Sequence, residues 1–496
     1  MRNALFFIPL ITIALSSCGP KSEKSADTAG VEVPVVTKAV TAKNYLNGKK
    51  FCETYKEITS KEIGKYVKVP MSYTKESEDS MEIYTYTVKP FDPKKPTVIF
   101  VDGGPGQNTH GMRDNLPEEI NQINFDQRGL GCSAPETFEQ YRNADLFSTE
   151  NNVRDIDLIR KAYGLDKVTV YGVSYGTVPA TAYGSTFKES ARSIILEGVF
   201  GGTQFMHKDE YKVEKMNLAI ADLNKEQRQA ISDGLEKKDK NIKNLLTLIN
   251  QSFFSNGGMT TVKDRYLVKF LNKDGSINSE YAKKIDEYLK DETNYPSEQQ
   301  PAAIDEHIYA VIACRDLDRL KSDNSYIAYS SEKGFFIKNY PQGEEEFVKY
   351  CEEHGVPKSK MTPHDYTKHK LVMPTYYFQG SHDGATGAEG ALKHWRQNAK
   401  DTGFFMLLQK GGHNPYLSMI RVSADEKDDK ELIEIQKENY GLFVNAVEAK
   451  PITQEDIARV NGTESTFKWV LYLTEDVDSD GWKKELEGIK EYFRKN

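Results

Sequence analysis

Short apolar runs that break off at glycine constrain the fold of this chain most strongly. Residues 96–101 form the first run, and a glycine-rich turn at 102–106 follows it directly. A strand that is apolar along its whole length is typical of a parallel sheet covered on both faces. The same pattern recurs at 168–171, 375–378 and 404–408. Since helical stretches such as 152–163 lie between the runs, the sequence predicts an α/β fold with a mostly parallel sheet.

A long segment without this pattern divides the predicted sheet. Residues 201–365 are mostly helical in pattern and rich in charged side chains, and the buried-strand pattern resumes after them. We therefore expect one core in two parts, 49–200 and 366–496, with a helical cap at 201–365 between them and a C-terminal helical extension. The formal net charge of −8 includes no stripe of lysine and arginine, so nucleic acid is not an expected partner.

The N-terminus has the pattern of an export signal. Arg2 is followed by an apolar run at 4–15, which is shorter than the roughly 20 residues that span a bilayer. The run ends in Leu-Ser-Ser before Cys18, which resembles a bacterial lipobox. We expect a signal peptide at 1–17, a lipidated Cys18 with a flexible tether at 18–48, and anchoring to the bacterial cell envelope, at the outer membrane or periplasmic face, through the lipid alone. An ordinary secretory signal with an incidental cysteine is the alternative.

Four further cysteines remain for an oxidising compartment, namely Cys52, Cys132, Cys314 and Cys351. Four cysteines allow three pairings. We predict Cys52–Cys132 and Cys314–Cys351, with buried free thiols as the alternative. No cysteine spacing matches a metal site, and we expect neither a metal nor a cofactor.

Residues 172–176 match the pattern G-x-S-x-G and place Ser174 between a predicted strand and a helix of small residues. This context is typical of a nucleophile elbow, a strained turn that lifts a serine hydroxyl above the carboxyl ends of the strands. A glycine-rich turn without chemistry is the alternative. The motif predicts Ser174 as a nucleophile.

A serine nucleophile needs a base and a carboxylate that orients the base. In enzymes with such an elbow the acid and then the histidine follow the serine along the chain. Asp383 and His413 each follow a predicted strand, so we expect both on the same rim as Ser174. Asp365 is a weaker competitor for the acid, and His382 for the base.

The same rim offers donors for a developing negative charge. We expect the backbone N–H of Tyr175 to supply one donor and that of Gly103 or Gly104 to supply the other. A plain glycine turn at 103–104 is the alternative.

Taken in order, the motifs at 102–106, 126–133 and 172–176, the Asp383 loop and the Gly412-His413 pair resemble the prolyl iminopeptidase and tripeptidyl aminopeptidase family of α/β-hydrolases. The resemblance implies a serine exopeptidase that releases one to three residues from peptides with a free N-terminus. Asp102 departs from the prolyl branch, which usually has histidine at that position. This difference puts prolyl-type substrate contacts in doubt.

An aminopeptidase must also bind the substrate ammonium group, and buried carboxylates of the cap would suit it. The candidates, which the sequence does not rank, are Glu197, Asp305, Glu306 and Asp316. For any single one of them, an ordinary solvated charge is the favoured interpretation. We interpret Asp126 and Arg128 as a structural ion pair and not as catalytic groups.

A second motif lies near the C-terminus. Its carboxylates match the spacing of a calcium loop, and they are Asp476, Asp478, Asp480 and Glu487. We favour the simpler interpretation that these acids cap a C-terminal amphipathic helix.

Two other functions remain open at this point. A carboxylesterase or lipase would use the same triad but favour an apolar cap. A catalytically silent surface-binding lipoprotein would use the fold only for binding.

Overall fold

The computed structural model describes most of the core and parts of the insertion. The described residues are 45–46, 48–49, 52–53, 63–73, 79–107, 116–202, 223–237, 239–251, 268–293, 305–317, 326–330, 335–339, 344–362, 364–420, 430–462 and 467–473. The signal peptide, Cys18, most of the tether and the candidate calcium loop lie outside them. No helix in the described part of the chain is long and apolar enough to cross a membrane.

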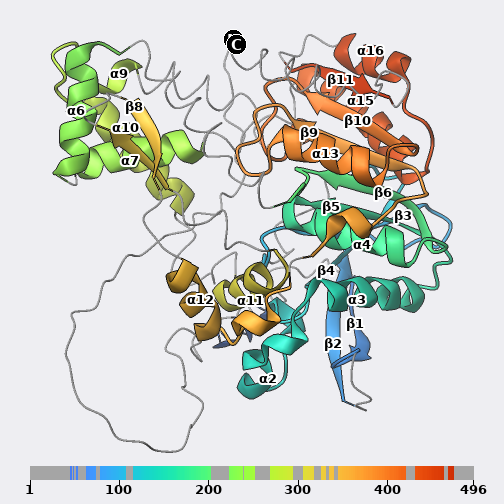
Figure 1. Cartoon of the computed structure of the whole chain (residues 1–496). Coiled ribbons are helices and arrows are strands. Elements are labelled where there is room, and N and C mark those ends of the chain that lie inside the picture. Colours follow the sequence, from blue (N-terminus) through green and yellow to red (C-terminus); the bar gives the residue numbers. More distant parts are fainter. Residues whose placement is uncertain are drawn as a thin grey trace, which may run out of the picture.

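A nine-stranded sheet forms the centre of the described core (Figure 1). Its strands, in spatial order, are β1 (Ile63–Pro70), β2 (Ser80–Thr87), β4 (Asn121–Phe125), β3 (Thr97–Val101), β5 (Val168–Val173), β6 (Ala191–Glu197), β9 (Thr375–Gly380), β10 (Gly403–Leu408) and β11 (Trp469–Tyr472). The strands from β4 to β10 pair in parallel, and antiparallel strands extend the sheet at both ends. The predicted α/β fold with a mostly parallel sheet is confirmed.

Helices cover both faces of this sheet because the strands are apolar on both sides. In β3, Ile99 and Val101 belong to one buried cluster, while Val98 and Phe100 belong to another on the opposite face. The first cluster includes side chains of α3 (Thr149–Ala162), α4 (Thr177–Thr186) and α13 (Ala388–Asn398). The second includes side chains of α14 (Pro415–Ile420), α15 (Lys430–Val447) and α16 (Gln454–Gly462). A short helix, α2 (Phe138–Arg142), precedes α3.

The insertion contains helices and a hairpin. Its elements are α6 (Lys225–Glu236), α7 (Lys240–Gln251), α9 (Val268–Phe270), α10 (Ser279–Thr293), α11 (Glu306–Asp316), β7 (Tyr326–Ser330), β8 (Phe335–Asn339) and α12 (Glu344–Glu353). Figure 1 shows α11 and α12 near α2, apart from the group that contains α6, α7 and α10. Ile308, Val311 and Ile312 of α11 are buried within the first core cluster. This part of the predicted cap therefore packs against the core.

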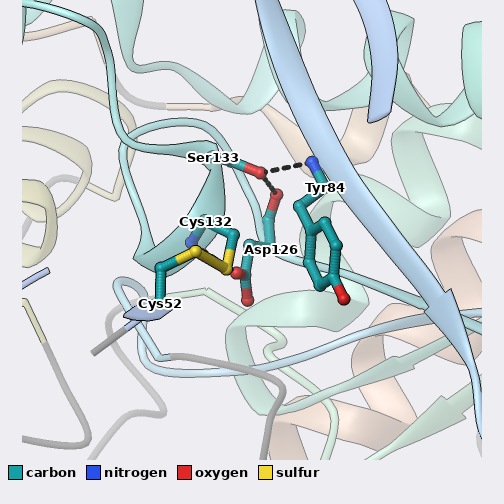
Figure 2. The surroundings of a disulfide bond; sticks show 5 residues. All are labelled: Cys52, Tyr84, Asp126, Cys132 and Ser133. Carbon is teal, nitrogen blue, oxygen red and sulfur yellow. Dashed lines mark hydrogen bonds between the residues drawn. A yellow bond between two sulfur atoms is a disulfide. The ribbon is translucent and has the colours of Figure 1, made fainter. Parts of the chain in front are cut away.

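Two disulfides confirm the predicted pairing of the cysteines. Cys314 of α11 is bonded to Cys351 of α12, and Cys52 is bonded to Cys132. Figure 2 shows that Cys132 lies in the turn after β4, where Ser133 joins Asp126 to the backbone of β2. The bridge to Cys132 thus fixes residue 52 beside a turn of the α/β core.

The predicted ion pair between Asp126 and Arg128 is wrong. Arg128 is buried and pairs with Asp155 of α3 through its Nε (2.5 Å) and Nη2 (2.8 Å) atoms. The Asp126 carboxylate instead accepts the backbone N–H of Cys132 at 2.8 Å. The turn geometry explains the difference, because Arg128 extends toward α3 while Asp126 closes its own turn.

Candidate active site

Ser174 lies directly after β5, in a turn that only glycine permits on either side. Its backbone has φ 56°, which is rare for a residue with a side chain. A Cβ atom added at Gly172 would lie 2.2 Å from the carbonyl oxygen of Gly176. A Cβ atom at Gly176 would lie 2.1 Å from the carbonyl oxygen of Val101 in β3. The half-buried Ser174 therefore occupies the strained strand-to-helix turn that the motif predicts.

The glycine-rich turn after β3 contacts this serine. A Cβ atom added at Gly103 would lie 2.8 Å from the Cβ atom of Ser174. The Gly103 N–H donates to the Asp102 carboxylate at 2.7 Å. Because this bond already uses the Gly103 donor, Gly104 is the glycine of the predicted pair whose N–H is left for the predicted oxyanion site. Gly104 has φ +102°, a conformation that suits glycine.

Asp383 and His413 come together from two different strand ends. Nδ1 of His413 lies 3.0 Å from both carboxylate oxygens of Asp383. Neither competitor takes part in this pair. The carboxylate of Asp365 is exposed and caps its own turn by accepting the Thr367 N–H, and His382 donates its backbone N–H to the Gly411 carbonyl.

The Asp383 carboxylate is buried and surrounded by donors. Oδ1 accepts the backbone N–H groups of Ala385 (2.8 Å) and Thr386 (2.9 Å). Oδ2 accepts the Thr386 hydroxyl (2.8 Å) and the Gln379 amide (3.0 Å). Burial alone raises the pKa of this carboxyl, but the charge and hydrogen bonds of His413 and Thr386 outweigh burial and lower the pKa below its ordinary value. Asp383 is therefore ionised at neutral pH.

The His413 ring lies beside the strand next to Ser174. Val173 and Glu197 are paired in the register of β5 and β6, so Ser174 and Gly198 follow paired positions. A Cβ atom added at Gly198 would lie 2.9 Å from Cε1 of His413. Adjacent strands are about 4.8 Å apart. The predicted nucleophile, base and acid thus lie on one rim, at the carboxyl ends of β5, β10 and β9.

Two polar residues around Asp383 are absent from the sequence predictions. Thr386 also has its hydroxyl 3.2 Å from Nδ1 of His413. Gln379 joins the Asp383 carboxylate to the backbone of the segment after β6, because its oxygen accepts the Val199 N–H at 2.9 Å. The Asp-x-x-Thr spacing from 383 to 386 is a turn signal that points to Thr386. A glutamine at the end of an apolar strand carries no such signal.

Helix α11 lies against the glycine-rich turn. The Asp305 N–H donates to the Gly106 carbonyl at 2.8 Å, and a Cβ atom at Gly106 would lie 3.0 Å from the Tyr309 nitrogen. The Asp305 carboxylate caps α11 by accepting the Ile308 N–H, and it also accepts the Tyr141 hydroxyl. Burial raises the pKa of Asp305 to about 6, although these bonds oppose the shift.

The four candidate ammonium ligands differ in their partners. Glu197 is buried in the core sheet and accepts three hydrogen bonds. Asp316 is buried and accepts the Thr149 N–H at 2.6 Å. Glu306, in the first turn of α11 beside Asp305, is exposed. Of the four, Glu306 is therefore the carboxylate open to a ligand. The described residues include no group of three or more metal-ligating side chains that would hold an ion.

Comparison with known proteins agrees with this architecture. Residues 96–418, more than half of the chain, match the family described as alpha/beta hydrolase fold. A proline iminopeptidase of Xylella fastidiosa (strain 9a5c) is 33% identical over 111 residues, which is 22% of this chain and 34% of that protein. A proline iminopeptidase of Neisseria meningitidis (serogroup B, strain ATCC BAA-335 / MC58) is 32% identical over a stretch of the same coverage. The chain thus spans about a third of the length of these relatives.

One solved structure is that of a proline iminopeptidase-related protein from Thermus thermophilus. It is 15% identical, with a TM-score of 0.38, and the likeness covers 78% of this chain and 98% of that one.

Proposed function

Since the chain belongs to the alpha/beta-hydrolase family, we propose that it is a serine aminopeptidase that releases one to three residues from the free N-terminus of peptides. The observation that carries the proposal is the juxtaposition of a serine elbow, an Asp383–His413 pair and the acidic first turn of α11 against the glycine-rich turn. The likeness to proline iminopeptidases supports it. Because that likeness covers about a third of those proteins, the proposal names no preferred N-terminal residue of the substrate.

The proposed reaction follows from the roles of five groups. The Ser174 oxygen attacks the scissile carbonyl carbon, and His413 takes the serine proton while Asp383 holds the Nδ1–H. The N–H groups of Tyr175 and Gly104 bind the oxyanion. His413 then gives its proton to the leaving amine, and an acyl-enzyme remains. Water, deprotonated by His413, attacks this ester and releases the N-terminal fragment, which restores Ser174.

Recognition of a free N-terminus requires a negative charge at a fixed distance from the serine. Glu306 has an exposed carboxylate in the first turn of α11, whose Asp305 is bonded to the glycine-rich turn. Asp305 itself is held by Tyr141 and by its own helix. We assign Glu306 as the ligand of the substrate ammonium group.

Paired substrates test the aminopeptidase. The purified protein is assayed on tripeptide anilides with a free or an acetylated N-terminus. Hydrolysis of the free form alone, lost in Ser174→Ala, is expected. Equal hydrolysis of the acetylated form, or cleavage of short-chain esters alone, would contradict an aminopeptidase, and the second result would indicate an esterase.

A charge change on α11 tests the ammonium ligand. Glu306→Gln should raise KM for free tripeptide anilides about tenfold with little change in kcat, because a bond to a charged group contributes about 1.5–3 kcal/mol. Glu352→Gln, an exposed change on the neighbouring α12, is the matched control and should leave KM unchanged. An unchanged KM in Glu306→Gln would remove this residue from the site.

A further inference from the structure

Glu197 is a fully buried carboxylate at the end of β6 whose oxygens are all engaged. Oε2 accepts the hydroxyl of Tyr171 in the neighbouring β5. Oε1 accepts the backbone N–H groups of Tyr416 (2.8 Å) and Leu417 (3.0 Å). Its exposed fraction is 0%. A charge of this kind is costly to bury, so its partners and its position need a reason.

The partners of Glu197 bracket the proposed base. Tyr416 and Leu417 form the first turn of α14, which begins two residues after His413. On the other side, Gly198, the residue after Glu197, packs against the His413 ring. The carboxylate therefore holds the segment that follows His413, while the adjoining backbone contacts the imidazole itself.

The charge of Glu197 also interacts with His413. Burial raises the pKa of Glu197 to about 7, while Tyr171, the two N–H groups and the charge of His413 oppose the shift. An attraction between a carboxylate and an imidazolium acts equally on both partners. An ionised Glu197 therefore stabilises the protonated form of His413.

We propose that Glu197 is a positioning residue for His413, which fixes α14 so that the imidazole meets Ser174 and stabilises the imidazolium formed as the serine proton is taken. This inference rests on the serine chemistry proposed above, but not on the peptide specificity. Glu197 touches neither substrate nor the reacting atoms, and it acts through His413.

Few of the described groups around Glu197 can titrate. They are Tyr171 from β5, Tyr416 from α14 and His413, with Phe378 paired beside it in β9. The Tyr416 hydroxyl donates to the Asn439 carbonyl on α15, and burial keeps the pKa of Tyr416 well above its ordinary value. Asp383, which is bonded to Nδ1 of His413, has a lowered pKa and stays ionised.

The test removes the charge but keeps the shape. In Glu197→Gln the amide oxygen still accepts the two N–H groups of α14, and the Tyr171 hydroxyl can turn to accept from the amide. Two pH profiles are measured from pH 5 to 9, namely kcat/KM on a tripeptide anilide and the rate at which a fluorophosphonate probe labels Ser174. We expect the plateau of each profile, its highest rate, to fall about tenfold. We also expect the acidic limb of each profile, where the rate rises with pH as the base loses its proton, to move to lower pH by about 0.5–1 unit.

A matched variant separates positioning from mere stability. Thr169→Val, at the other end of β5, also removes buried hydrogen bonds, because the Thr169 hydroxyl donates to the Val447 carbonyl and lies 2.8 Å from the Ser193 hydroxyl. It should lower the melting temperature without moving the acidic limb. Tyr171→Phe, which keeps the carboxylate but removes one donor, should move the limb in the same direction as Glu197→Gln by a smaller amount.

The outcomes distinguish the two proposals. A shifted labelling profile without peptide cleavage would support Glu197 and contradict the aminopeptidase. If the protein cleaves peptides but Glu197→Gln changes neither the acidic limb nor the plateau, the role of Glu197 is overturned and the aminopeptidase proposal stands. If Glu197→Gln fails to fold, an unshifted Tyr171→Phe overturns it, and a wild-type protein that the probe never labels overturns the serine chemistry and this inference together.

Discussion

Replacing Asp383 by asparagine tests the acid of the proposed triad, because its two oxygens have different neighbours. Oδ1 faces the backbone N–H groups of Ala385 and Thr386, which cannot rotate. Oδ2 faces the Thr386 hydroxyl, which can turn to accept a proton, and the Gln379 amide, whose oxygen is held by the Val199 N–H. Two fixed donors at Oδ1 against one at Oδ2 place the asparagine oxygen at the Oδ1 position and its NH2 group at the Oδ2 position.

This orientation gives the imidazole the wrong proton. Nδ1 of His413 lies 3.0 Å from both positions, so it would accept from the new NH2 group. The ring then carries its proton on Nε2, the atom that must accept the proton of Ser174. In a serine protease the same exchange lowers kcat by about 10⁴, equivalent to about 5 kcal/mol in the barrier. We expect a loss of that order here.

Single-turnover labelling by a fluorophosphonate and kcat on a free tripeptide anilide measure the effect. Asp365→Asn is the matched control, because Asp365 is the exposed aspartate that the sequence offers as a competitor. It should keep wild-type rates. If Asp383→Asn retained more than about a tenth of the activity, or if Asp365→Asn lost it, the assignment of the acid would be refuted.

Three further changes test the frame around the site. Asp155→Asn leaves the buried Arg128 without its counter-charge and should lower the free energy of unfolding by about 3–5 kcal/mol in urea denaturation, whereas a loss below about 1 kcal/mol would show that the pair is not buried in solution. Cys314→Ser opens the bridge to Cys351, 37 residues away, and should lower the free energy of unfolding by up to about 4 kcal/mol through loop entropy, seen as a lower melting temperature in the absence of reductant. We also propose that Cys18 carries the lipid anchor. Cys18→Ala should then release the protein from the membrane fraction of expressing cells, and retention there would contradict the anchor.

The candidate site was predictable because its parts follow local patterns at strand ends. The apolar runs became β3, β5, β9 and β10, and the carboxyl ends of parallel strands meet at one edge of a sheet. Ser174, Asp383 and His413 each follow such a run. Their order along the chain therefore sufficed to place them on one rim.

The remaining features depend on which distant element packs nearby. Arg128 has Asp126 as its neighbour in sequence, but its partner Asp155 lies on α3. The apolar face of α11 gave no sign of whether it packs within the cap or, as observed for Ile308, against the core. No sequence pattern marks Gln379 either. Its side chain joins the segment after β6 to the Asp383 carboxylate, and these two parts come together only in the fold.

The two carboxylates around His413 differ in charge because Asp383 is bonded to the imidazole, whereas Glu197 is bonded to Tyr171 and to the first turn of α14. The charge and hydrogen bond of His413, together with the bonds from Thr386, outweigh burial and lower the pKa of Asp383. For Glu197, burial outweighs its hydrogen bonds and raises its pKa to about 7. Below pH 7 one negative charge therefore faces the imidazole, and a second develops as the pH rises through that value. The added charge stabilises the imidazolium in the range where a free histidine loses its proton, which is where a serine hydrolase needs the base to be both neutral at rest and stable when protonated.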